Sequence, residues 1–209
     1  MNRHSYFHIF LGGEELVKKD KPKYKQIIDA AVIVIAENGY HQAQVSKIAK
    51  QAGVADGTIY LYFKNKEDIL ISVFQEKMAV FVSKLEQILE KDHSAAEKLK
   101  HMIESHFNLL ANDIHLAIVT QLELRQSNTE IRLKINSVLR EYLLLLDQIL
   151  ISGMEANEFD KDMDIRLARQ MVFGTMDETI TTWVMNEHKY DLVELAPKVH
   201  HLLMKGMRA

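Results

Sequence analysis

Residues 45–70 read VSKIAKQAGVADGTIYLYFKNKEDIL, and this stretch decides the fold of the N-terminal part of the chain. Its first apolar residues recur at i, i+3, i+4 and i+7, the spacing of one helix face: Val45, Ile48, Ala49 and Ala52. Gly53 suits the end of that helix, and a second short helix is expected over residues 56–63. Two short helices joined at a glycine are typical of a helix-turn-helix.

The second of these helices carries the residues best suited to contact DNA. In a helix-turn-helix, the second helix enters the major groove and its first turn meets the base edges. Gly57 would let the backbone approach closely, and Thr58 offers a hydroxyl and a methyl group to a base edge. Tyrosine hydroxyls and lysine ammonium groups suit phosphates. The expected DNA-binding residues are Ser46, Lys47, Gly57, Thr58, Tyr60, Tyr62, Lys64 and Lys66.

Part of this stretch also has an ordinary structural explanation. Ile59, Tyr60 and Phe63 stand at i, i+1 and i+4, so they could form a core stripe. We assign Ile59 and Phe63 to the core and keep Tyr60 among the residues that contact DNA.

The rest of the chain is predicted to be helical. It contains only two prolines, and its apolar residues recur at three and four rather than at two. A short oxygen side chain with a glutamate three residues later marks a helix start at Ser94, Ser127 and Asp191. Helices are expected at residues 23–38, 45–52, 56–63, 66–91, 94–111, 114–126, 128–153, 164–187 and 191–207. The predicted fold class is therefore all-α, with a three-helix helix-turn-helix domain followed by a larger helical bundle.

Charge is distributed unequally over the expected segments. These are an N-terminal extension (residues 1–20), a DNA-binding domain (21–68) and a ligand-binding and dimerisation domain (69–209), the last two joined by a continuous helix. The net charge of −3 alone disfavours a nucleic-acid binder. However, residues 21–68 carry +2 and residues 69–209 carry −5. The small basic surplus lies where DNA would bind, and a dimer would double it.

Several classes of protein are disfavoured by what the sequence lacks. It has no cysteine, and no apolar run approaches the roughly 20 residues of a membrane span, so we expect a cytoplasmic protein. The ten histidines show no metal-ligand spacing, and no catalytic motif is present. We therefore predict no metal site, no cofactor and no enzyme.

Six short motifs follow one another in residues 23–70. They are Asn38-Gly39, Ile48-Ala49, Ala52-Gly53-Val54, Gly57-Thr58-Ile59-Tyr60, Tyr62-Phe63 and Lys66-Glu67. In this order they resemble the DNA-binding domain of the TetR family of bacterial transcriptional regulators. One departure is Ala55, where that family often has a serine or threonine that caps the recognition helix. The helix is then expected to begin at Asp56, whose charge would be repelled by a nearby phosphate.

Longer strings extend the resemblance to about residue 195. They are KPKYKQIIDAA, AENGYH, VADGTIYLYFKNKEDILIS, LAIVTQLELRQSN, RLARQM, FGT and TTWVMN. They resemble TetR-type regulators of fatty acid degradation in Bacillus-like bacteria. The resemblance implies a homodimeric repressor of β-oxidation genes that binds a palindromic operator and is released by long-chain acyl-CoA. It also implies a dimer formed by the two C-terminal helices, and the apolar stripe of residues 192–207 agrees with this.

Apolar residues of the bundle are candidates for the wall of a ligand cavity, although most such residues simply fill a core. Arg125 interrupts an apolar helix, so it needs a carboxylate partner or an anionic ligand, with Arg132 and Lys134 as further candidates for a nucleotide phosphate. Gly174 marks either close helix packing or room for a ligand. The expected ligand-binding residues are Phe74, Met78, Phe81, Phe107, Leu110, Ile118, Leu122, Arg125, Arg132, Phe173, Gly174 and Trp183.

Two other functions stay open from the sequence. A TetR-type regulator that senses a cationic lipophilic drug could neutralise it with Glu123, Asp177 and Glu178. A helical acyl-CoA carrier or enzyme with no DNA role would not depend on Thr58 and Tyr60.

The first sixteen residues have no counterpart in the resembled family. We interpret Gly12-Gly13-Glu14 as a translated ribosome-binding sequence and Val17 as the true start. The alternative is a natural extension whose aromatic residues Tyr6, Phe7 and Phe10 dock elsewhere.

Overall fold

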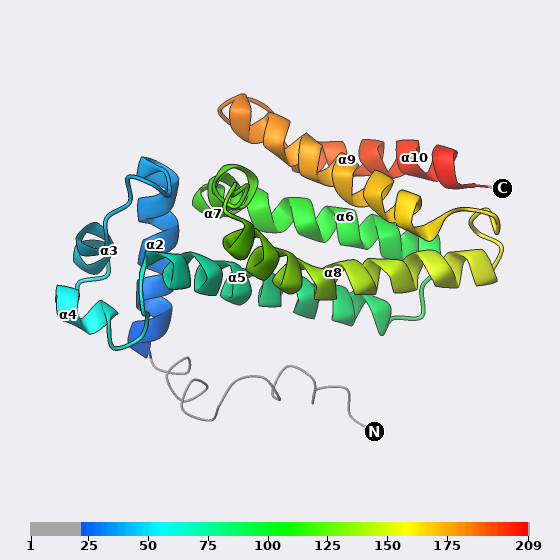
Figure 1. Cartoon of the computed structure of the whole chain (residues 1–209). Coiled ribbons are helices and arrows are strands. Elements are labelled where there is room, and N and C mark those ends of the chain that lie inside the picture. The colour runs from blue at the N-terminus through cyan, green and yellow to red at the C-terminus, as the bar shows by residue number, and fades with distance from the viewer. Residues whose placement is uncertain (1–21, 209) are drawn as a thin grey trace, which may run out of the picture. The chain divides into compact units, whose positions relative to one another are not determined.

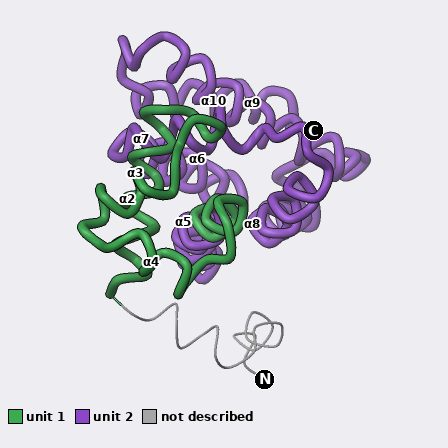
Figure 2. Tube along the Cα trace, turned by 60° about the vertical axis from the view of Figure 1, so that its left-hand side comes forward, with its two compact units in different colours: residues 1–73 green, residues 74–209 purple. Residues whose placement is uncertain are grey.

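The computed structural model describes residues 22–208, in which nine α-helices occur and no strand (Figure 1). The prediction of an all-α fold is confirmed. The described chain divides into two compact units between Val73 and Phe74, inside helix α5 (Lys66–Leu89) (Figure 2). The expected extension over residues 1–20 and the expected start at Val17 lie outside the described residues.

The first unit contains α2 (Pro22–Asn38), α3 (Val45–Gln51), α4 (Asp56–Ile59) and the beginning of α5. Helix α2 packs on α3, and α3 packs on α4. The predicted core positions Ile59 and Phe63 are 0% and 2% exposed, which confirms that assignment. The Phe63 ring stacks on Tyr24 at 5.2 Å between centroids, so the turn after α4 is attached to the first helix.

The turns of this unit follow from a few residues. Gly39 and Gly53 have φ angles of 73° and 63°, the left-handed region that glycine adopts without steric cost. Helix α4 begins at Asp56 with no side-chain cap from Ala55, as the missing serine or threonine predicted. It ends at Ile59 rather than at residue 63, because the chain turns and the Phe63 N–H donates to the Ile59 carbonyl at 3.0 Å.

The second unit is a helical bundle. After the later part of α5 it contains α6 (Ala95–Ala111), α7 (Ile114–Ile118), the π-helical turn η2 (Val119–Glu123), α8 (Thr129–Glu155), α9 (Ile165–Met185), the 3₁₀ turn η3 (Val193–Leu195) and α10 (Ala196–Met207). Helix α6 packs against α8 and α10, and α9 packs against both of these helices as well (Figure 1). The core between them includes the fully buried side chains of Leu99, Phe107 and Leu146.

Some details of the predicted helices need correction. Ser94 forms the predicted capping box with Glu97, but Asn128 rather than Ser127 caps α8, by accepting from the Glu130 and Ile131 N–H groups. Residues 114–126 are not one α-helix, because the chain widens into η2 after Ile118.

Helix α8 continues to Glu155, beyond the expected end at residue 153, so Gly153 lies inside it. A Cβ at this position would be 2.2 Å from Cδ2 of Phe159, and the fully buried Phe159 ring occupies the space that the glycine leaves. The residue therefore serves a close packing contact between α8 and the loop that follows it.

Two general properties hold for residues 22–208. None of their helices combines the length and the apolar character needed to cross a lipid bilayer. No group of three or more histidine or carboxylate side chains among them is arranged to hold a metal ion.

Candidate functional sites

The first unit has a hollow of about 490 Å³ beside α3 and α4. Three of the predicted DNA-binding residues, Ser46, Tyr60 and Lys66, come together there. The full lining is His41, Ala43, Gln44, Val45, Ser46, Asp56, Tyr60 and Lys66. Tyr60 is 60% exposed, although tyrosine is usually half-buried or more, so its side chain is available to a partner.

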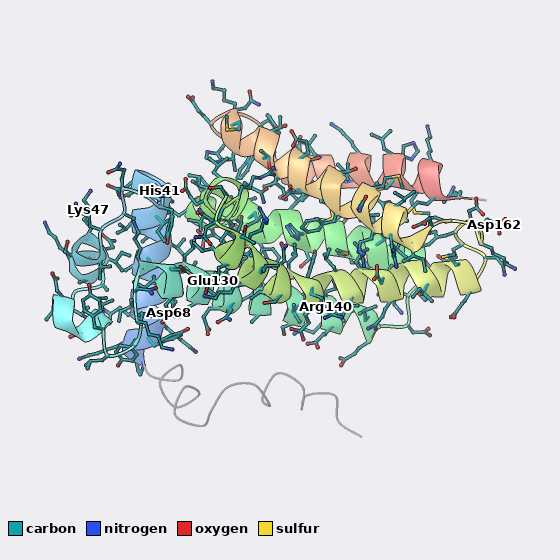
Figure 3. The ribbon with its side chains drawn as sticks, viewed as in Figure 1. His41, Lys47, Asp68, Glu130, Arg140 and Asp162 are labelled. Atoms are coloured by element: carbon teal, nitrogen blue, oxygen red, sulfur yellow. The ribbon has the colours of Figure 1, made fainter. Side chains whose placement is uncertain are left out.

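Two lysines near this hollow are fixed by contacts within the unit. Lys66 Nζ donates to the His41 carbonyl at 2.9 Å and lies 4.8 Å from the centre of the Tyr40 ring. Lys47 lies on α3 (Figure 3), and its Nζ donates to Asn38 Oδ1 at 2.7 Å. An ammonium group has three N–H donors, so each lysine keeps donors for a phosphate while its position is held.

The other predicted DNA-binding residues lie outside the lining of the hollow. Gly57 is exposed, and a Cβ there would meet nothing within 4 Å, which leaves the backbone of α4 open to close approach. Thr58 is half-buried beside it. Tyr62 is half-buried with its ring centre 6.3 Å from that of Tyr24, and Lys64 is exposed.

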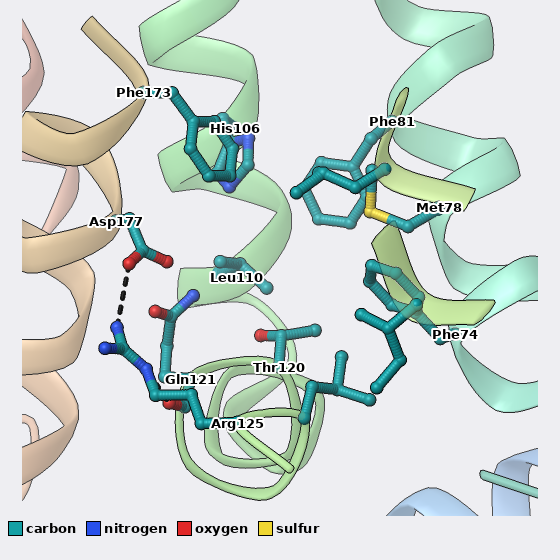
Figure 4. Close-up of a pocket in the computed structure, with 13 residues that line it drawn as sticks. Phe74, Met78, Phe81, His106, Leu110, Thr120, Gln121, Arg125, Phe173 and Asp177 are labelled. Atoms are coloured by element: carbon teal, nitrogen blue, oxygen red, sulfur yellow. Dashed lines mark hydrogen bonds and ion pairs between the residues drawn. The ribbon is translucent and has the colours of Figure 1, made fainter. Parts of the chain in front are cut away.

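The second unit contains a cavity of about 220 Å³ (Figure 4). Its apolar wall is built from α5, α6, α8, α9 and the end of η2 by Phe74, Met78, Phe81, Leu110, Leu124, Ile135, Leu139 and Phe173. Its polar lining consists of His106, Thr120, Gln121, Arg125 and Asp177. A largely apolar cavity with a few polar groups is the usual form of a small-molecule site.

Half of the residues predicted to bind ligand line this cavity. These are Phe74, Met78, Phe81, Leu110, Arg125 and Phe173. The others do not: Phe107 is a fully buried core residue, Ile118 is half-buried, and Leu122 and Arg132 are exposed. Trp183 is buried elsewhere and donates its indole N–H to the Tyr190 carbonyl at 2.8 Å.

Arg125 forms the centre of a polar cluster at one end of the cavity. Its guanidinium lies 2.8 Å from Asp177 Oδ2 and 3.2 Å from Thr181 Oγ1, and its Nε donates to the Gln121 carbonyl at 2.9 Å. With its amide nitrogen directed toward α9, the Gln121 side chain donates to Asp177 Oδ1 at 2.9 Å. The carboxylate partner that the sequence required for Arg125 is therefore Asp177.

The Arg125–Asp177 pair is only partly enclosed by the surrounding residues. Burial raises the pKa of Asp177 above its ordinary value, and this effect exceeds the opposite effect of Arg125. The Arg125 side chain is 55% exposed, so part of its guanidinium faces solvent. A positive group that is oriented by one carboxylate and still accessible can accept a second anion.

A histidine that the sequence interpretation did not assign lies farther along the cavity. His106 Nδ1 is 2.8 Å from the Tyr142 hydroxyl, and both side chains are buried. Burial lowers the pKa of His106 to about 4, so the imidazole is neutral near pH 7. Metal-ligand spacing assigns no role to His106, but the helical period places it four residues before Leu110 and on the same helix face.

Helices α9 and α10 expose apolar side chains on their outer surface. Leu167, Met185 and Leu202 are 64%, 66% and 66% exposed. Gly174 lies in a groove on α9 between Gln170, Met171, Thr175, Glu178 and Thr182, and not in the cavity. A Cβ added to Gly206 of α10 would lie 3.7 Å from Met171 Sδ, so the two helices present a joint surface.

A helix-turn-helix unit followed by a helical bundle with a cavity is the arrangement of a bacterial transcriptional regulator. Comparison with known protein families shows that this chain belongs to the TetR family. Residues 27–73 match the family described as bacterial regulatory proteins, tetR family, and residues 74–206 match the YsiA-like protein, C-terminal region. The predicted family is therefore confirmed.

Individual relatives narrow this further. The chain is 64% identical over 191 residues to the fatty acid metabolism regulator protein of Bacillus subtilis, with 91% of this chain and 98% of that protein covered. A crystal structure of the transcriptional regulator FadR from Bacillus subtilis in complex with stearoyl-CoA is 66% identical, with a TM-score of 0.85, and covers 88% of this chain and 98% of that one. The fatty acid degradation regulator FadR from Bacillus halodurans is 64% identical, also with a TM-score of 0.85, over 88% and 100% of the two chains. The chain is thus a transcriptional regulator of the TetR type.

Proposed function

We propose that this protein is a homodimeric cytoplasmic repressor of fatty acid β-oxidation genes that binds a palindromic operator and releases it when long-chain acyl-CoA binds. The observation that carries the ligand part is the cavity of the second unit, whose apolar wall ends at the accessible guanidinium of Arg125. This combination suits a molecule with an apolar chain and an anionic head. The relative crystallised with stearoyl-CoA supports the same class of ligand.

The charges around the cavity argue against the cationic drug that the sequence left open. Asp177 is the one carboxylate in the described lining, and it is already paired with Arg125. Glu178 lies in the groove on the outer surface of α9 instead. A cation would have to displace Arg125 from Asp177, whereas an anion can bind Arg125 directly.

DNA binding is proposed for α3 and α4. This surface offers groups suited to base edges and phosphates: exposed Tyr60, open Gly57 and the positioned Lys47 and Lys66. The small basic surplus of residues 21–68 also supports binding as a dimer, since two copies would contact two half-sites about 34 Å apart.

Dimerisation is proposed through α9 and α10. Their exposed Leu167, Met185 and Leu202, together with the open groove at Gly174, form a surface more apolar than a monomer requires. Gly174 has no side chain, so a helix of a second copy could approach the backbone of α9 closely there.

The release mechanism is a shift between two conformations. At about 220 Å³ the cavity is smaller than the roughly 300–1,000 Å³ of typical ligand sites, so a long acyl chain has to widen it. Phe74, Met78 and Phe81 of α5 form part of the wall, and α5 begins in the first unit at Lys66. Acyl-CoA would therefore favour a different position of α5, and by linkage DNA must weaken acyl-CoA binding by the same factor.

The test measures the binding of labelled promoter fragments from the host's fatty acid degradation genes, with and without stearoyl-CoA. We expect binding of a dimer to at least one fragment and its loss as stearoyl-CoA approaches saturation, while coenzyme A alone has little effect. Unchanged DNA affinity at saturating stearoyl-CoA would contradict the mechanism. Absence of any sequence-specific DNA binding would instead favour a carrier or enzyme without a DNA role.

A further inference from the structure

One polar group that lines the cavity, the His106 imidazole, takes no part in the proposed contacts with the ligand head group. His106 is 9% exposed and lines the cavity from α6. Its Nδ1 contacts the Tyr142 hydroxyl, but within residues 22–208 its other ring nitrogen, Nε2, has no hydrogen-bond partner. Nε2 is not one of the enclosed, unpaired side-chain atoms of the described residues, so it is open to the cavity and can pair with a group placed there.

The contact with Tyr142 determines which nitrogen carries the proton. The Tyr142 hydroxyl is buried and has no other hydrogen-bond partner among the described residues, so only donation to His106 Nδ1 leaves its hydrogen paired. A neutral imidazole then carries its hydrogen on Nε2. His106 is therefore a hydrogen-bond donor in an otherwise apolar part of the cavity.

The position of this donor separates it from the polar cluster at Arg125. Figure 4 shows Arg125 and His106 at opposite ends of the drawn lining, with Leu110 between them. On α6, His106 is about one turn, or roughly 5–6 Å, from Leu110. The rings of Phe81 and Phe173 also line this end, and the His106 ring centre is 4.7 Å from that of Phe81.

We propose that His106 Nε2–H donates a hydrogen bond to an oxygen atom in the acyl part of the ligand. This inference rests on the proposed binding of acyl-CoA and adds a condition to it: the cavity prefers a chain that brings an acceptor oxygen beside this imidazole. Two oxygens have the required chemistry, the thioester carbonyl and a hydroxyl or keto oxygen on the chain. Tyr142 acts as a positioning residue, because it holds the tautomer and the orientation of the ring.

The test compares the affinities of three probes for the full-length protein by calorimetry. The probes are stearoyl-CoA, its thioether analogue without a carbonyl, and 3-hydroxystearoyl-CoA. We expect the wild-type protein to bind the probe that carries the recognised oxygen about fivefold to tenfold more tightly than the matched probe that lacks this oxygen. This factor corresponds to one neutral hydrogen bond. Preference for stearoyl-CoA over the thioether identifies the carbonyl, and preference for the hydroxylated chain over stearoyl-CoA identifies a chain oxygen.

The variants assign that preference to His106. His106→Phe should reduce it to less than about twofold, while His106→Gln, which keeps an N–H donor, should retain part of it. His101→Phe is the matched control, because His101 is on the same helix but does not line the cavity. Thermal unfolding of each variant checks that it is folded.

Three results would overturn the inference. One is wild-type affinity that does not differ within either pair of probes, and another is a preference that survives in His106→Phe. The third is a failure of all three probes to bind, which would refute the proposed ligand itself. The first two outcomes leave acyl-CoA binding intact, so the two failures are distinguishable.

Discussion

The guanidinium of Arg125 lies 2.8 Å from Asp177 Oδ2, and this ion pair joins the segment after η2 to the middle of α9. An anionic ligand would share this guanidinium with Asp177, and the two negative charges would repel each other. The two partners should have opposite effects on ligand binding when they are changed.

Replacing Arg125 with glutamine should weaken stearoyl-CoA binding by about tenfold, because one charge-assisted hydrogen bond is lost at a partly exposed site. Asp177→Asn should leave the affinity unchanged or raise it a few-fold, since a carboxylate that repels the ligand is removed. Arg169→Gln is the matched control, because Arg169 pairs with Asp147 at 2.7 Å but does not line the cavity. Equal losses for both arginine variants would contradict a direct contact with the ligand.

Removing the Tyr60 hydroxyl should weaken operator binding without affecting folding. Tyr60→Phe keeps the exposed ring but loses a hydrogen bond to a phosphate or base edge, so we expect an affinity several-fold lower. Lys47→Ala should also reduce the salt slope of log affinity by about 0.9 for each lost phosphate contact. Fluorescence anisotropy at several salt concentrations measures both effects. Lys189→Ala, an exposed lysine of the second unit, should behave as wild type.

A charge on the surface of α9 and α10 should disrupt the dimer. Leu202→Glu places a carboxylate at a residue that is 66% exposed in the single chain, and burying it against a second copy would be costly. Sedimentation analysis should give a monomer with weak operator binding. Leu144→Glu, at an exposed leucine of α8, should remain dimeric. The opposite pattern would assign the interface to α8.

Acid should destabilise the wild-type protein through His106. Above about pH 6.5 this imidazole is neutral in both the folded and unfolded chain, but between about pH 6.5 and 4 only the unfolded chain binds the proton. Stability therefore falls as pH falls, by about 2 kcal/mol near pH 5 and about 3 kcal/mol near pH 4. Urea unfolding near pH 7 and pH 5 should give a drop about 2 kcal/mol smaller in His106→Phe. An identical drop in both proteins would argue against the neutral buried imidazole.

A methyl group at Gly153 should destabilise the second unit. The added Cβ would overlap the buried Phe159 ring, and such overpacking costs about 1–3 kcal/mol, more than the roughly 1 kcal/mol that alanine gains in a helix. The free energy of unfolding in urea measures the difference. Gly153→Ala in a Phe159→Leu background should recover part of the loss. A stabilised Gly153→Ala protein would mean that the ring moves away easily.

Much of the fold could be predicted because local patterns determine it. The buried positions Ile27, Ala31 and Ile35 recur with the helical period in α2, and the Ser94–Glu97 box is a short-range signal. The predicted start of α8 differs from the observed one by one residue. Ser127 and Asn128 both suit an N-cap, and the sequence pattern does not show which of them the backbone places there.

The cavity was only half predictable for a different reason. Periodicity identifies the apolar face of a helix but not which part of that face meets a void, so Phe107 and Leu110 looked equivalent although only Leu110 lines the cavity. The partnership of Arg125 with Asp177 spans 52 residues, and no local pattern records it. Likewise, the contact between His106 Nδ1 and Tyr142, which leaves Nε2 available to a ligand, joins two different helices and has no local sequence signal.

The π-helical turn η2 lets this segment hold one extra residue without changing the direction of the residues that follow it. Its Leu124 N–H reaches back to the Val119 carbonyl at 3.2 Å, so the turn contains one residue more than an α-helical turn. A residue added to a helix that stayed α-helical would rotate each following side chain by about 100°, whereas a π-helical turn takes up the extra residue within itself. Arg125 therefore keeps the direction toward α9 that its contact with Asp177 requires. A related chain with one residue fewer between Ile118 and Leu124 could thus close a regular α-helical turn and still direct its arginine toward α9.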